Sequence, residues 1–79
     1  MTIADEKTRE LIALAVAITL RCDGCITVHT AAARERGATR EEIAEVLGVA
    51  VSVNAGAAVV YSTRALDAFD ATAEINLNA

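Results

Sequence analysis

Apolar residues recur along this chain with the spacing of α-helices, and few residues interrupt them. The first apolar stretch, residues 11–20, follows Asp5 and Glu6, whose negative charges suit the first turn of a helix. We therefore expect a first helix over residues 5–20. Residues 11–18 are apolar on every side, which indicates a central helix enclosed by others.

The next helix is expected to begin near Cys22 or Asp23 and to end at Arg36. Gly37 directly follows and fits a C-terminal cap, since glycine adopts the left-handed backbone conformation that such caps need. The polar residues near Arg36 are expected to face water.

Thr39-Arg-Glu-Glu42 has the pattern of a capping box and should open a third helix that continues to about Val53. The segment Asn54-Ala-Gly56 is expected to break or kink that helix. A fourth helix is expected over residues 57–71. Its larger apolar side chains are Tyr61, Leu66 and Phe69.

Composition supports one all-α domain over residues 1–79, with about four helices. The chain has no proline and four glycines, and 79 residues are enough for a single domain only. Hydrophobic residues make up 54 % of it and aromatic residues 3 %. One small globule cannot hide so much aliphatic surface, and such an excess usually ends in a subunit interface. We expect a homo-oligomer.

Charge and apolar run lengths exclude several partners. A net charge of −4 and a pI near 4.8 give no electrostatic basis for nucleic-acid binding. The run at residues 11–20 is shorter than the roughly 20 residues of a membrane helix. Ser52 and Asn54 interrupt the run at residues 46–61, so we expect buried protein and no membrane partner. The acidic start lacks the features of a signal peptide, which makes the cytoplasm the expected location.

Both cysteines and the only histidine lie within eight residues of one another. On a helix, Cys22 and Cys25 are i, i+3 neighbours, while Cys25 and His29 are i, i+4 neighbours, so the three side chains share a face. A helix N-terminus favours thiolate over thiol. Two sulfurs that can close a disulfide, beside an imidazole that can move a proton, indicate redox chemistry.

Three other interpretations of the cysteine pair need weighing. Haem attachment of the c type requires histidine directly after the second cysteine, where this chain has Ile26. A structural zinc site needs four ligands, and the fourth would have to be a carboxylate or come from another subunit. A zinc site and two inert buried cysteines both remain open, and either would make the chain a non-catalytic helical oligomer.

Two charged residues near this cluster have an ordinary interpretation from spacing alone. Glu10 lies at the edge of the first apolar run, and by itself resembles a solvated helix residue such as Glu6. Arg21 could add positive charge near a thiolate, although an ordinary solvated arginine at the end of a helix is the favoured interpretation.

The pattern Glu-x11-Cys-x2-Cys-x3-His, followed by Gly-Ala-Thr-Arg-Glu-Glu-Ile-Ala-Glu-Val from Gly37, resembles the carboxymuconolactone decarboxylase superfamily. It is most similar to the alkylhydroperoxidase AhpD-like branch, over residues 7–68. The resemblance implies an all-helical fold that assembles as a trimer or a trimer-based hexamer. It also implies a redox disulfide between Cys22 and Cys25, and a proton relay of Glu10 and His29. No metal and no separate cofactor are implied.

The same resemblance implies a peroxide or a disulfide as substrate, and an external dithiol of the lipoyl-linked kind as reductant. A lipoylated protein and a peroxiredoxin would be the partner proteins. Two departures bear on this. Gly24 stands where AhpD proteins have a further histidine, which favours thiol–disulfide exchange over full alkylhydroperoxidase activity. The chain also begins almost at the motif helix, which increases the expected need for oligomerisation. The decarboxylase branch lacks the cysteine pair, so decarboxylation is disfavoured.

Overall fold

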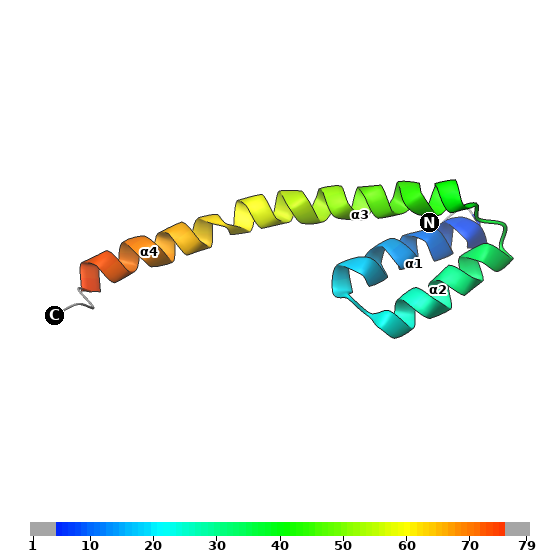
Figure 1. The fold of residues 1–79 in the computed structure, drawn as a ribbon, viewed down its shortest axis with the longest axis horizontal. Helices are drawn as coiled ribbons and strands as arrows, with labels where there is room; N and C mark the ends of the chain where they lie inside the picture. Colours follow the sequence, from blue (N-terminus) through cyan, green and yellow to red (C-terminus); the bar gives the residue numbers. More distant parts are fainter. Residues whose placement is uncertain (1–4, 76–79) are drawn as a thin grey trace.

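The computed structural model describes residues 5–75, and these form helices joined by short turns (Figure 1). The helices are α1 (Glu6–Leu20), α2 (Asp23–Glu35), α3 (Arg40–Tyr61) and α4 (Thr63–Ile75). The expected all-α class is confirmed. The bounds of α1 and α2 also lie within one residue of those expected from the sequence.

The first two helices form an antiparallel hairpin, and α1 also packs against the N-terminal half of α3 (Figure 1). The core is small because α2 and α3 each pack against α1 and not against each other. It consists of aliphatic side chains that are at most 9 % exposed: Leu11, Leu14, Ala17, Ala33 and Ala50. Alanines at the contacts let the helices approach closely.

Local signals account for the helix boundaries. The carboxylate of Asp5 accepts from the Thr8 N–H at 2.7 Å and caps α1. Gly37, with φ 88°, ends α2 in the left-handed conformation as expected. Thr39 and Glu42 form the expected capping box, with reciprocal hydrogen bonds of 3.1 and 2.9 Å.

The expected break at residues 54–56 is wrong, because α3 continues through it to Tyr61. The Asn54 side chain donates back to the Ala50 carbonyl at 2.7 Å instead of ending the helix. Glycine at position 56 costs only about 1 kcal/mol in a helix interior, which the surrounding alanines and valines tolerate. The interruption lies at Ser62, whose hydroxyl donates to the Ala58 carbonyl.

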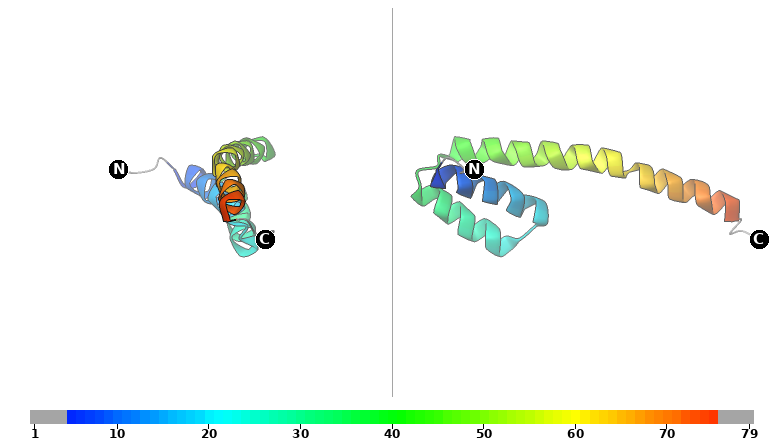
Figure 2. Two further views of the ribbon diagram at one scale, coloured as in Figure 1. Left: turned by 90° about the vertical axis from the view of Figure 1, so that its left-hand side faces the viewer. Right: turned by 180° about the vertical axis from the view of Figure 1, so that it is seen from behind.

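Because only Ser62 separates α3 from α4, the chain has three long helical segments rather than four separately packed helices (Figure 1). The third segment is a rod that extends far beyond the hairpin, and the right-hand view of Figure 2 shows no other described helix beside its distal part. The molecule measures 63 × 25 × 24 Å, with a radius of gyration of 19.0 Å.

Two expectations about burial are not met within one chain. The run at residues 46–61 was expected to be buried, yet residues 51–61 are all exposed, because no described helix packs closely against them. The helix expected to be enclosed, α1, is covered by α2 and α3 but leaves Ile12, Val16 and Leu20 between 46 and 70 % exposed.

One helical segment, Arg40–Ala73, is long and apolar enough to cross a membrane by length and composition, with a mean hydropathy of 1.9 in its most apolar window. Core helices of water-soluble proteins meet the same criterion, so this observation alone is weak evidence for a membrane location.

Candidate functional site

The two cysteines lie at the N-terminus of α2 and are joined by a disulfide. Cys22 is the N-cap of this helix, and its Sγ accepts a hydrogen bond from the Cys25 backbone N–H at 3.2 Å. Their Cα atoms are 5.2 Å apart, as one turn of helix dictates. Both residues are half-buried, so the sulfurs are not sealed inside the core.

His29 lies one turn after Cys25, and its Nδ1 is 2.6 Å from Oε2 of Glu10. The two residues come from different helices and are 19 positions apart in the sequence. Their side chains are 34 and 27 % exposed, respectively, so water is partly excluded from this pair. A carboxylate at Nδ1 fixes the orientation of the imidazole ring and leaves Nε2 available to exchange a proton.

Two ion pairs hold the helices together near the end of the hairpin opposite the disulfide. Lys7 on α1 donates to Glu42 on α3 at 2.9 Å, and Glu6 on α1 pairs with Arg36 after α2. The hydrogen bond from Lys7 lowers the pKa of Glu42, and the same bond raises the pKa of Lys7. These contacts link the first turn of α1, which precedes Glu10, to the end of α2 and the start of α3.

Arg21, which the sequence suggested only as a source of positive charge or as a solvated helix end, has a structural role at the turn between α1 and α2. It adopts the left-handed conformation, with φ 53°, and directly precedes the cysteine pair. The Arg21 and Cys22 N–H groups bond the Ile18 and Ala17 carbonyls at 3.1 Å, which closes α1 and turns the chain into α2. In the sequence, the signal for this turn was the polar Arg21 directly after the long apolar run, because no glycine marks the turn.

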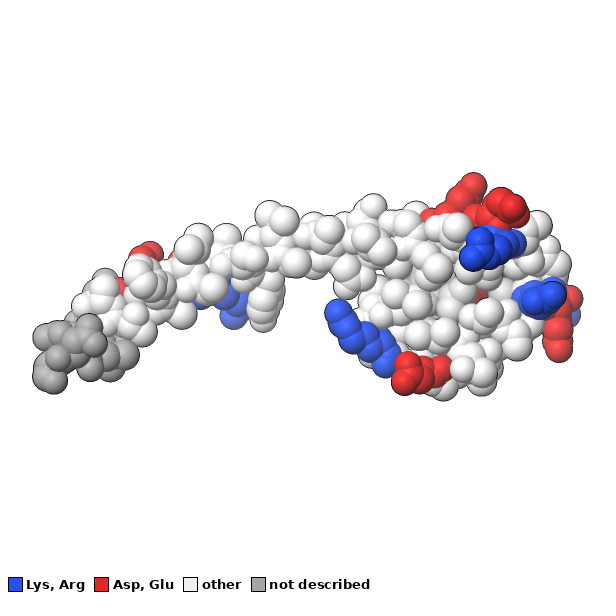
Figure 3. Space-filling model, in the orientation of Figure 1, with Lys and Arg blue, Asp and Glu red and all other residues white. Residues whose placement is uncertain are grey.

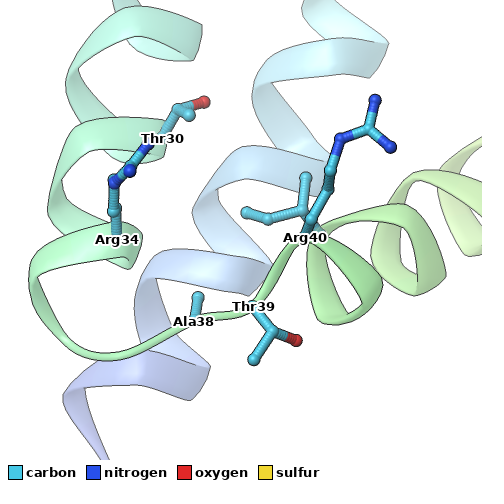
Figure 4. A pocket seen from close by; sticks show the side chains of 6 residues that line it. Thr30, Arg34, Ala38, Thr39 and Arg40 are labelled. Atoms are coloured by element: carbon cyan, nitrogen blue, oxygen red, sulfur yellow. The ribbon is translucent and has the colours of Figure 1, made fainter.

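The larger hollows lie at opposite ends of the hairpin. One, of about 500 Å³, is lined by residues at the end of α2 and the start of α3, namely Thr30, Arg34, Ala38, Thr39, Arg40 and Ile43 (Figure 4). The arginine side chains extend from different helices along its sides (Figure 4). A second, of about 570 Å³, lies where α3 passes the end of α1, next to Arg21 and so near the disulfide.

The part of the chain that the structure describes holds no set of ligands for the alternative zinc site. Over residues 5–73, no three or more His, Cys, Asp or Glu side chains are grouped so that they could hold a metal ion. Cys22 and Cys25 bond to each other, and the Nδ1 of His29 faces a carboxylate. All four residues singled out from the sequence thus lie along the α1–α2 interface, as two pairs.

Three bacterial proteins are similar to this chain. A protein of Haemophilus influenzae is 54 % identical over 67 residues, one encoded in the cox locus of Paracoccus denitrificans is 44 % identical over 66, and one of Cupriavidus necator is 43 % identical over 63. All three are described as uncharacterised. The matches cover 80–85 % of this chain but only 56–60 % of each relative. The chain therefore spans less than two thirds of their length.

The model of one protein family matches residues 4–68, which include the helical hairpin, the disulfide and the Glu10–His29 pair. This match covers most of the chain, and the chain belongs to the carboxymuconolactone decarboxylase family.

Proposed function

We propose that this protein is a thiol–disulfide oxidoreductase of the AhpD-like type, acting as an alkylhydroperoxidase-like antioxidant enzyme. The family to which it belongs includes AhpD-like peroxidases as well as decarboxylases. The observation that carries the proposal is the Cys22–Cys25 disulfide, one helical turn from a histidine that a carboxylate orients. Reversible closure of that disulfide supplies the two electrons of the reaction.

In the reduced protein, His29, held by Glu10, accepts the proton of one thiol. The thiolate attacks the O–O bond of a hydroperoxide, which gives a sulfenic acid and an alkoxide that is protonated to the alcohol. The other thiol then displaces water from the sulfenic acid and forms the Cys22–Cys25 disulfide. Two thiols are oxidised while the hydroperoxide is reduced to alcohol and water.

The same thiolate can attack a disulfide of a partner protein, forming a mixed disulfide that the second cysteine resolves. An external dithiol, such as a lipoyl group on a partner protein, would return two electrons and two protons. We place this cycle in the cytoplasm and in a homo-oligomer, a trimer or hexamer, as the resemblance to AhpD-like proteins implies. A peroxiredoxin would be the downstream partner.

Peroxide-dependent oxidation of dihydrolipoamide tests the proposal, using wild type, Cys22→Ser and Cys25→Ser. We expect turnover in wild type alone, with two thiols lost per chain on oxidation. Thr27→Ser, on the exposed side of the same helix, is the matched control and should retain activity. Turnover that survives in both cysteine variants would contradict the proposal. Thiols that resist oxidation while zinc co-purifies would favour a non-catalytic metal-binding oligomer.

A further inference from the structure

The hollow where α2 ends and α3 begins has a lining that the redox chemistry does not use (Figure 4). Cys22 caps the start of α2 and Arg34 lies in its last turn, and a helix of 13 residues is about 20 Å long. The hollow is therefore remote from the disulfide. Its volume of about 500 Å³ is in the range of small-molecule sites and exceeds what one inorganic ion fills.

Two arginines from different helices line this hollow, Arg34 on α2 and Arg40 on α3 (Figure 4). Among the residues that the structure describes, neither arginine makes an ion pair, whereas Lys7 and Arg36 at the same end of the hairpin both do. Figure 3 shows charged side chains of both signs gathered over this end of the molecule. Two like charges beside one open space repel each other, and an anion between them would remove that repulsion.

The position of Arg40 is unfavourable for the helix that carries it. Arg40 is the first residue of α3, where the helix dipole disfavours a positive charge, whereas Arg34 lies in the last turn of α2, where the dipole favours one. Thr39 and Glu42 already form the capping box, so the cap of α3 is complete without Arg40. A residue that breaks a local rule in this way is expected at a functional site.

The rest of the lining suits a negatively charged organic molecule. Ala38 and Ile43 are half-buried and supply apolar surface for a carbon skeleton. Thr30 is the i, i+4 neighbour of Arg34, so its hydroxyl lies on the same face of α2. The oxygen of Thr39 accepts the Glu42 N–H, which leaves its own O–H proton to donate. No carboxylate lines the hollow within the described part of the chain, so its charges favour an anion.

We propose that this hollow binds a small organic dianion, with Arg34 and Arg40 as its cationic ligands. Guanidinium groups bind the oxygens of carboxylate and phosphate groups through two parallel hydrogen bonds, so a dicarboxylate and a phosphate monoester share the required chemistry. Two negative charges match the two arginines, and Ala38 and Ile43 contact the carbon part of the molecule. The site is separate from the cysteine pair and does not depend on the redox proposal.

Titration of the ¹⁵N-labelled full chain with succinate and with glycerol 3-phosphate tests the site by NMR. Low ionic strength is used, because salt screens such contacts. The backbone amide signals of residues 38–40 should move and saturate with at least one of the two compounds. Binding of succinate alone identifies a dicarboxylate site, and binding of glycerol 3-phosphate alone a phosphate-ester site. Succinamide has the same carbon skeleton without the charges and should produce no shift.

Variants then test the two arginines. Arg34→Gln and Arg40→Gln should each weaken binding roughly tenfold or more, because each removes a charged hydrogen-bond donor. Arg9→Gln removes the same charge from an exposed position on α1 outside the hollow, and should bind as wild type does. Circular dichroism checks that each variant is helical. If an arginine variant fails to fold, Thr30→Val, which replaces only an exposed hydroxyl, should still weaken binding severalfold.

Inorganic phosphate that binds as tightly as glycerol 3-phosphate would indicate a site for an adventitious ion only and would overturn the proposal. Absence of binding by both compounds would also overturn it, as would amide shifts that map to other parts of the chain. Unchanged affinity in both arginine variants, or an equal loss in Arg9→Gln, would have the same consequence.

Discussion

At the scale of single residues, the candidate chemistry depends on one contact across two helices. Glu10 and His29 meet at 2.6 Å on partly buried side chains, whereas Glu6, one turn earlier on α1, pairs with Arg36 at the far end of the hairpin. Two glutamates on the same helix therefore have different partners, and this difference separates an orienting role from an ordinary ion pair.

Glu10→Gln should slow thiol oxidation by hydroperoxide, because the imidazole loses the carboxylate that orients it. We expect a loss of roughly tenfold or more, given the usual size of general-base effects. It should also change the pH at which the rate is half-maximal, which a purely structural role would not do. Glu6→Gln is the matched control. Equal rates and pH profiles for the two variants would remove Glu10 from the mechanism.

The two cysteines differ in their contacts with the helix end, and this difference predicts which reacts first. Cys22 caps α2 and accepts the Cys25 N–H, so a thiolate at Cys22 gains a hydrogen bond and the favourable end of the helix dipole. In the reduced protein we expect iodoacetamide to modify Cys22 first, about tenfold faster than Cys25. Peptide mapping after a short reaction measures this ratio. Faster modification of Cys25 would indicate that the neighbouring His29 dominates.

At the scale of helices, caps and ion pairs position α1 against the other two helices. The Thr8 N–H bonds the carboxylate of Asp5 and lowers its pKa, while the Lys7 hydrogen bond lowers that of Glu42. Both carboxylates are solvated near the surface, so each contributes modestly. Folding stabilises the ionised form of both carboxyl groups, so both contributions to stability change with pH in the same direction.

A carboxylate with a lowered pKa stabilises the folded state above its unfolded pKa, and this contribution is lost as pH falls through the folded pKa. The ordinary values are 3.8 for Asp5 and 4.5 for Glu42. We therefore expect the unfolding temperature to be constant near pH 6. It should fall as the pH drops below about 4.5, where these carboxyl groups become protonated. Thermal unfolding followed by circular dichroism measures it. Glu42→Gln should be less stable than wild type at pH 6 and should flatten the slope, while an unchanged slope would contradict this assignment.

At the scale of the whole molecule, the chain is a compact hairpin with a long helical extension. The buried residues lie in α1, α2 and the first half of α3, and the extension contributes no buried side chain of its own. The hairpin holds the Glu10–His29 contact within one chain, whereas residues 51–73 are exposed along their whole length.

If assembly completes the fold, stability should depend on protein concentration, because association stabilises only the folded state. We expect the unfolding temperature of wild type to fall on hundredfold dilution, by a few degrees or more for a domain of this size. Scanning calorimetry and fluorescence of an extrinsic dye together cover this concentration range. Val59→Asp places a charge on the exposed apolar surface of the helical extension and should show no such dependence. A wild-type unfolding temperature that does not change with dilution would contradict coupled folding and assembly.

The sequence by itself determined the features that rest on neighbouring residues. The capping box at Thr39 and the turn at Gly37 both follow from residues within a few positions of the chain, whereas Asp5, expected inside the first turn of α1, is the cap that precedes it. The spacing of Cys22, Cys25 and His29 on one helix was likewise readable, because helical geometry places residues three and four apart side by side.

Only the tertiary structure decided what depends on contacts between distant parts of the chain. It decided that Glu10 meets His29 across the hairpin, where spacing alone favoured a solvated residue. It also decided that α3 runs through Asn54 and Gly56, and that residues 51–73 extend beyond the hairpin and are exposed. The physical reason is that an apolar helix face shows only that the helix must be buried on that side, whereas packing in three dimensions determines which partner buries it.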